Sequence, residues 1–179
     1  RREVMDIGAG VVGVHRRLGA TLARLDSAVR VGQPLPLQPM LETEAIQPHM
    51  WQTAMQSGAL DLLDVATVWR LSEFYNELSV GTQQLHRLGE LSETVLLPVA
   101  GAPAEEFWRP AAGLPSGGPS AAAEPPTGGP PAGAPQPRYR LQPRYQWYTA
   151  TLGELYETTG TIVAQSDSLA RLLAPPGRR

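Results

Sequence analysis

Apolar residues recur at alternating spacings of three and four in three separate segments of the chain. This period is that of one face of an α-helix. The stripes are Val4, Ile7, Val11, Val14, Leu18, Thr21, Leu25 and Ala28; Val68, Leu71, Tyr75, Leu78, Thr82, Leu85, Leu88 and Val95; and Tyr148, Leu152, Leu155, Thr159, Ile162, Ser166, Leu169 and Leu173. Such stripes pack against other helices at shallow angles. No segment shows the sustained two-residue alternation of a strand, so the pattern predicts an all-α chain.

Prolines and glycines indicate where the long helices begin and end. Gly32 and the prolines that follow it stop the first helix, because proline cannot continue one. Pro98 ends the middle helix, Pro143 opens the last one, and Pro175 and Pro176 close it.

A fourth, shorter helix is predicted at about residues 48–57. Pro48 suits its first position, and Gly58 suits its C-terminal cap. Asp61 and Asp64 follow, and their carboxylates can cap the start of the middle helix. We expect this short helix, which carries Trp51, to cover one end of the long helices.

Residues 98–143 differ sharply in composition from both flanks. Twelve prolines and seven glycines fall among these 46 residues, and the stretch SGGPSAAAEPPTGGPPAGAPQP carries almost no large apolar side chain. Such a segment cannot bury enough surface to offset its chain entropy. We predict a disordered linker, within which Phe107 and Trp108 are the one local anchor.

These elements predict one small helical domain interrupted by a linker. Residues 1–97 are expected to form a helical hairpin with the short helix inserted in it, and residues 144–174 a C-terminal helix that docks on it. The predicted fold class is all-α, with three long helices as an antiparallel bundle and the last helix antiparallel to the middle one.

Residues 8–13 contain a G-x-G-x-x-G pattern, made by Gly8, Gly10 and Gly13. A dinucleotide-binding fingerprint needs a strand before it and further strand–helix units after it. The chain offers neither, so a dinucleotide-binding fragment is an alternative that we keep without favouring it. The other interpretation is packing, in which Ala9 and Gly13 let another helix approach.

The stretch RYRLQPRYQWY, residues 138–148, gathers cations and aromatic rings. Its candidate interaction surface consists of Arg138, Tyr139, Arg140, Arg144, Tyr145 and Trp147. Such groups can stack on bases or bind phosphates, which makes a nucleic-acid-binding or nucleotide-binding regulator the second alternative. Three arginines make a small electrostatic footprint, and the net charge of −2 argues against nucleic acid as the partner. The opposing interpretation is a helix lead-in whose aromatic rings pack onto the other helices.

Several classes of chemistry have no support in the sequence. The chain has no cysteine, which excludes zinc–thiolate sites, disulfides and thiol catalysis. His15, His49 and His86 share no metal-ligand spacing, and no G-x-S-x-G pattern occurs. We therefore predict no catalytic residues, no metal and no cofactor, and we do not expect an enzyme.

The block MWQTAMQSGALDLLDVATVWRLSEFYNEL, residues 50–78, resembles one found in uncharacterised bacterial helical proteins. In them it often follows a membrane-spanning helix. The resemblance covers about a quarter of the chain and implies no activity. It does imply a membrane segment upstream of Arg1.

The function predicted from these observations is a non-enzymatic helical interaction module. Its partner would be another protein, or a second copy held through the helix stripes, because a core with so few large side chains is marginal. A membrane tether would come from a segment outside this chain, which leaves a membrane-associated or a cytoplasmic location.

Overall fold

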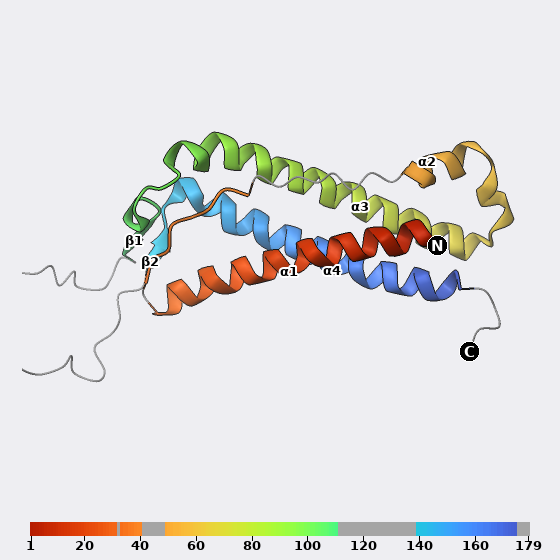
Figure 1. Cartoon of the computed structure of the whole chain (residues 1–179), viewed down its shortest axis with the longest axis horizontal. Helices are drawn as coiled ribbons and strands as arrows, with labels where there is room; N and C mark the ends of the chain where they lie inside the picture. The colour runs from red at the N-terminus through yellow and green to blue at the C-terminus, as the bar shows by residue number, and fades with distance from the viewer. Residues whose placement is uncertain (32, 41–48, 111–138, 175–179) are drawn as a thin grey trace, which may run out of the picture.

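The computed structural model describes residues 1–31, 33–40, 49–110 and 139–174. Within these ranges the protein is mostly helical, as the sequence predicted, and long helices make up most of it (Figure 1). The helices and strands are α1 (Arg2–Val31), α2 (His49–Gln56), α3 (Val65–Leu91), β1 (Trp108–Pro110), β2 (Tyr139–Leu141) and α4 (Gln146–Leu172). Short helical turns connect some of them, notably Ala59–Leu62 before α3 and Ser92–Leu96 after it.

The small pair of strands departs from the all-α prediction. β1 and β2 pair antiparallel, with Trp108 opposite Leu141 and Pro110 opposite Tyr139. Each strand has three residues, which is too short for alternation to be recognised in the sequence. Trp108 and Leu141 point into the core from this pair and are buried.

The predicted linker also differs from the structure at both of its ends. Described residues 98–110 and 139–143 form helical turns and the strand pair instead of an unfolded chain. Phe107 is completely buried and packs on Tyr145, with ring centroids 5.1 Å apart. The anchoring by Phe107 and Trp108 is the physical reason, because two large buried rings offset the entropy of ordering the chain around them. Residues 111–138, the rest of the predicted linker, lie outside the described residues.

Helix α4 packs on both of the other long helices. Figure 1 shows α1 and α3 running in the same direction and α4 running in the opposite one. The sequence analysis expected residues 1–97 to form a helical hairpin, in which the first and middle helices would be antiparallel. They are parallel, and residues 33–40 run back along the molecule after α1 ends (Figure 1).

The returning segment, residues 33–40, carries three prolines and is here called the proline strap. Its carbonyl groups accept hydrogen bonds from buried side chains: Trp108 Nε1 donates to Leu35 O at 2.6 Å, and the Tyr148 hydroxyl donates to Gln38 O at 2.8 Å. Leu37, which belongs to the strap, has a buried side chain. Proline lacks an N–H group, so the strap brings few donors that would need partners of their own.

The stripes predicted from the sequence form the core. Every predicted position of the α4 stripe from Tyr148 to Leu169 is buried. The buried residues form two clusters along the helices. One, around Leu152 and Leu155, includes the rings of Phe107, Trp108 and Tyr145, and the other gathers Val4, Ile7, Val11, Leu71, Phe74, Tyr75, Leu78, Ile162 and Leu169.

A close approach between α1 and α4 occurs at Gly8. A Cβ atom added to Gly8 would lie 2.4 Å from Ser166 Oγ, so only glycine fits at this position. The Ser166 hydroxyl donates to Val163 O of its own helix at 2.8 Å, and this buried polar group is therefore satisfied. The predicted packing role of Ala9 and Gly13 is wrong, since Ala9 is exposed and a Cβ on Gly13 would meet nothing within 4 Å.

The predicted caps at Gly58 and Asp64 are confirmed, whereas Asp61 lies within the short turn and does not cap α3. Gly58 follows α2 with a φ of 70°, the left-handed conformation that favours glycine. Asp64 caps α3 by accepting from Thr67 N at 2.9 Å and from the Thr67 hydroxyl at 2.6 Å. Both bonds lower the pKa of Asp64 below its ordinary value, and the bond from the Thr67 hydroxyl has the larger effect.

The Gly8 contact predicts opposite effects for alanine substitutions at two glycines that lie two residues apart on α1. Gly8→Ala should destabilise the protein by about 1–3 kcal/mol, because the added methyl group forces α1 away from Ser166. Gly10→Ala should stabilise it by up to about 1 kcal/mol, because nothing lies within 4 Å and alanine is the better helix former. Urea unfolding followed by circular dichroism measures both. Equal effects of the two substitutions would contradict the close approach.

The Tyr148 contact predicts a loss of stability in alkali. Burial raises the pKa of Tyr148 to about 12 from an ordinary value of 10. The folded state therefore holds this proton more tightly than the unfolded state, so the contribution is complete below pH 10 and is lost as the pH rises towards 12. Tyr148→Phe should reduce this loss by roughly 2 kcal/mol, measured by urea unfolding across that range. An unchanged pH dependence in the variant would show that the Tyr148 hydroxyl is not buried.

Candidate functional site

The aromatic residues predicted as an interaction surface serve mainly to close one end of the helices. Tyr145 is 1% exposed, and Tyr139 and Trp147 are half-buried. Arg140 and Arg144 are exposed, and Arg138 lies outside the described residues. The interpretation of this stretch as a helix lead-in therefore describes its rings better than an open stacking platform does.

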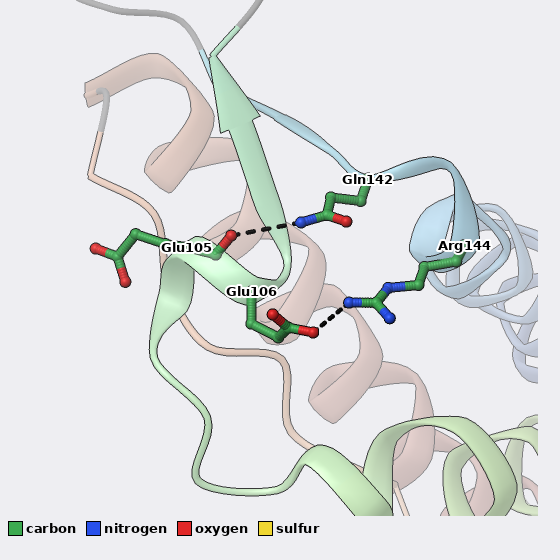
Figure 2. Close-up of polar contacts among 4 residues, drawn as sticks. All are labelled: Glu105, Glu106, Gln142 and Arg144. Atoms are coloured by element: carbon green, nitrogen blue, oxygen red, sulfur yellow. Dashed lines mark hydrogen bonds and ion pairs between the residues drawn. The ribbon is translucent and has the colours of Figure 1, made fainter.

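Arg144 already has partners within the chain. Figure 2 shows its guanidinium group paired with the Glu106 carboxylate, beside the bond from Gln142 Nε2 to Glu105 O at 3.4 Å. The guanidinium also lies 4.7 Å from the centre of the Tyr145 ring. These contacts join the turn before β1 to the turn before α4. Arg144 is therefore occupied in holding the two sides of the strand pair together.

Arg140 lies opposite Arg109 across the two strands. Both side chains are exposed, and like charges at directly opposite positions repel each other. The two guanidinium groups make a small positive spot on the outer face of the pair. A protein that binds nucleic acid through its backbone typically makes about 6–10 phosphate contacts, so this spot is a small footprint for that purpose.

Gly8, Gly10 and Gly13 do not form a dinucleotide-binding turn. All three lie inside α1, which begins at Arg2, and no strand precedes them among residues 1–31. Their backbone N–H groups are therefore directed along the helix and do not cradle a phosphate group. The alternative of a dinucleotide-binding fragment through residues 8–13 is wrong for this structural reason.

His15 has a structural contact that the sequence analysis missed. Its Nδ1 atom lies 3.1 Å from Tyr156 O and 3.0 Å from the Thr159 hydroxyl oxygen, and its ring stacks on Tyr156 at 4.2 Å. Gly160 makes room for the imidazole ring, since a Cβ there would lie 3.2 Å from it. In the sequence, the trace of this contact is Gly160 itself, the glycine that lies opposite His15 in the structure.

The other histidines do not gather into a metal site. His86 Nε2 lies 3.2 Å from the Glu90 carboxylate, one turn away on an exposed face of α3. The His49 side chain is outside the description. Among the described residues, no three histidine, cysteine or acidic side chains lie close enough to hold a metal ion.

Large apolar side chains are exposed mainly at the end of the molecule where α1 begins and α4 ends, far from the strand pair. Seven of the ten such side chains in the described part of the chain belong to this apolar end: Met5, Met55, Leu62, Leu63, Val65, Trp69 and Leu172. Leu62 is 88% exposed, Val65 85% and Trp69 67%. We call these three residues the ridge; Leu62 ends the turn before α3, and Val65 and Trp69 lie on the first turns of α3, on the face turned away from Leu71 and Tyr75. Exposed apolar clusters of this kind mark interaction surfaces.

A groove of about 930 Å³ lies beside the ridge. Its apolar lining includes Val4, Ile7, Trp51, Leu63, Leu71 and Leu173, and Leu62 of the ridge forms part of its wall. Its charged lining residues are Arg1, Arg2, Glu3 and Asp6. Two cations and two anions balance each other, so this end groove presents an apolar floor with a neutral rim.

One contact chain holds α2 at the edge of the end groove. The Trp51 ring stacks on Tyr75, with centroids 4.7 Å apart, and the Tyr75 hydroxyl donates to Glu3 Oε2 at 2.6 Å. Burial raises the pKa of Tyr75 above its ordinary value, and the hydrogen bond to Glu3 raises it further by a smaller amount. Trp51 is only half-buried, so α2 borders the groove without filling it. The sequence analysis identified residues 50–78 as distinctive but not which of their apolar side chains face solvent.

Comparisons of the chain with protein-family models, curated proteins and solved structures give no match. The resemblance of residues 50–78 to bacterial helical proteins therefore stays a hypothesis. No helix in the described ranges is both long and apolar enough to cross a membrane.

Two substitutions in the arginine–aromatic stretch test its structural role. Tyr145→Ala should destabilise the protein by about 3–5 kcal/mol, because it empties a buried site beside Phe107. Arg144→Ala should cost less than about 1 kcal/mol, because its ion pair is exposed to solvent. Thermal unfolding of both variants measures the difference. A small cost for Tyr145→Ala would mean that this ring is available to a ligand instead.

Proposed function

We propose that this chain is a non-enzymatic helical interaction module that binds a partner protein through its apolar end. The observation that carries the proposal is the exposure of Leu62, Val65 and Trp69 at this end of the molecule, together with the end groove that Leu62 lines. These side chains are held on a folded element, since Asp64 caps the helix that carries Val65 and Trp69. Leaving them in water costs free energy that a partner would recover by covering them.

The helix stripes are a poorer candidate for the contact. The prediction from the sequence is that these stripes hold another protein or a second copy. Their residues pack against one another within the chain, as Leu155 does with the neighbouring residues of α1 and α3 around a small cavity. A partner that used the stripes would have to displace this core. The apolar end needs no such rearrangement.

The partner surface that fits best is an apolar helix or a pair of helical turns. Val65 and Trp69 lie four residues apart on one face of α3, a spacing that can interdigitate with a facing helix. The end groove offers a recess for one or two large side chains of the partner. The balanced rim of Arg1, Arg2, Glu3 and Asp6 gives an anionic membrane no net electrostatic attraction, which favours a protein partner over a lipid surface.

We further propose that the three long helices act as one bundle, with α4 antiparallel to both α1 and α3 (Figure 1), and that this bundle presents the apolar end. Contacts of α4 with both α1 and α3 support this arrangement. A membrane segment upstream of Arg1 would follow from the resemblance of residues 50–78. In that case the module would work close to a membrane surface, with the membrane serving as a tether and the apolar end left for the partner.

Site-specific photocrosslinking in cells that produce the protein tests this function. A crosslinking amino acid at Leu62 should yield a defined protein adduct, identified by mass spectrometry, and the yield should fall when Trp69→Asp is added. The matched control is the same amino acid at Val80, an exposed position of α3 outside the ridge and the groove lining. No adduct at residue 62 above the yield at residue 80 would refute the function.

A further inference from the structure

We infer that the proline strap occupies a groove that recognises polyproline II segments, and that a proline-rich segment of a partner protein can take the strap's place there. This groove lies beside the strand pair and is separate from the apolar end. The strap from Pro36 to Pro39 reads P-x-x-P, a pattern that other proteins bind in aromatic-lined grooves.

The strap has the three-residue period of a polyproline II helix in two respects. The carbonyl groups that accept hydrogen bonds from the rest of the chain belong to Leu35 and Gln38, three residues apart. The side chain of Leu37 is buried, and those of Pro34 and Met40, three residues to either side, are half-buried. Such a helix has three residues per turn, so these carbonyls lie along one edge and these side chains along another. Leu35 and Gln38 also each precede a proline, which restricts them to extended backbone.

The groove supplies what a polyproline II segment needs, namely donors for its carbonyl groups and apolar surface for its side chains. A polyproline II helix has no internal hydrogen bonds, so its carbonyl groups stay available to a binding surface. Trp108 of β1 and Tyr148 of α4 donate to two of them, and both rings are buried. The side chain of Leu37 packs into the same core cluster as these rings. Because the donors address backbone carbonyls, they fit other segments of the same conformation.

The strap does not fill the groove. A cavity of about 120 Å³ remains beside it, lined on α1 by Thr21, Arg24 and Leu25. Among residues 33–40, Leu37 is the one side chain that is fully buried. A partner segment with a larger side chain at the cavity would gain dispersion contacts that the strap lacks. The strap is therefore a replaceable occupant.

Replacement of the strap has a cost, because the strap is tethered to the groove. A segment attached by a short linker competes at an effective concentration on the order of mM. A partner must therefore bind the open groove more tightly than the strap does as a free peptide. The strap thus acts as an autoinhibitory contact that selects among proline-rich partners.

Titration of the ¹⁵N-labelled full chain with a synthetic peptide of residues 33–40, QPLPLQPM, tests the inference. The indole N–H resonance of Trp108 reports on the groove. Leu37→Ala weakens the tethered strap, so this variant should bind the peptide at least about 10-fold more tightly than the wild-type chain does. A peptide with alanine in place of both Pro36 and Pro39 should bind the variant at least about 10-fold more weakly, because it is not pre-organised.

Two further variants separate release of the strap from general loosening of the fold. Leu169→Ala is the matched control, a truncation in the other core cluster, and it should leave the affinity for the peptide at the wild-type value. If Leu37→Ala fails to fold, the double variant Pro36→Ala/Pro39→Ala weakens the strap outside the core and should show the same gain in affinity.

Four results would overturn the inference. They are an unshifted Trp108 indole resonance in the strap variants, equal affinity of these variants and the wild-type chain, an equal gain in Leu169→Ala, and undiminished binding of the alanine peptide. A wild-type dimer that is lost in Leu37→Ala would assign the groove to the strap of a second copy, and would also overturn it.

Discussion

The fold depends on the packing of α1 and α3 against opposite sides of one buried stripe on α4. This stripe alternates large apolar residues with the small polar residues Thr159 and Ser166. The small residues satisfy their hydroxyl groups on carbonyl oxygens of α4 itself, as Thr159 does at 2.8 Å from Leu155 O. They therefore allow neighbouring backbones to approach closely without leaving a buried polar group unpaired. The fit of Gly8 on Ser166 and of His15 on Gly160 follows from this arrangement.

The two ends of the molecule differ because α4 is covered differently at each. At its beginning, the proline strap, the strand pair and the rings of Phe107, Trp108 and Tyr145 enclose the stripe. At its other end the stripe runs out at Leu169 and Leu173, where α1 and α3 begin and where Trp51 and Ala54 of α2 line the end groove. The end groove is thus a consequence of where α4 stops. The proposed interaction surface lies where the intramolecular core is incomplete.

Much of the helical architecture could be predicted from the sequence, because a stripe of period three and four identifies the face of a helix that must be buried. The burial of Leu152, Leu155 and Ile162 follows from this rule, and Asp64 and Gly58 were recognisable as caps. The direction of α1 relative to α3 could not be predicted, since it depends on a returning strap whose hydrogen bonds come from Trp108 and Tyr148, far away in the chain.

The candidate site was harder to predict than the fold, for a related physical reason. Periodicity shows that α3 has one apolar face, but Val65 and Trp69 lie on a second apolar face that does not meet the core. Nothing in the pattern distinguishes a face that α4 covers from one left in solvent. Likewise, helical spacing places Gly8 near the apolar stripe of α1 and Gly13 away from it, but only the position of Ser166 shows that Gly8 makes a close contact. Both the exposed face of α3 and the contact at Gly8 are decided by where α4, which is distant in the sequence, lies in the fold.

The central claim is that α1 and α3 are held together through α4. Native-state hydrogen exchange of wild-type protein and of Leu155→Ala tests it most directly, because Leu155 lines the small cavity where residues of all three helices meet. The account predicts that the most protected amides of α1, α3 and α4 lose the same free energy of opening, about 2–5 kcal/mol. Protection that persists in α1 or α3 while α4 loses its own would contradict the claim.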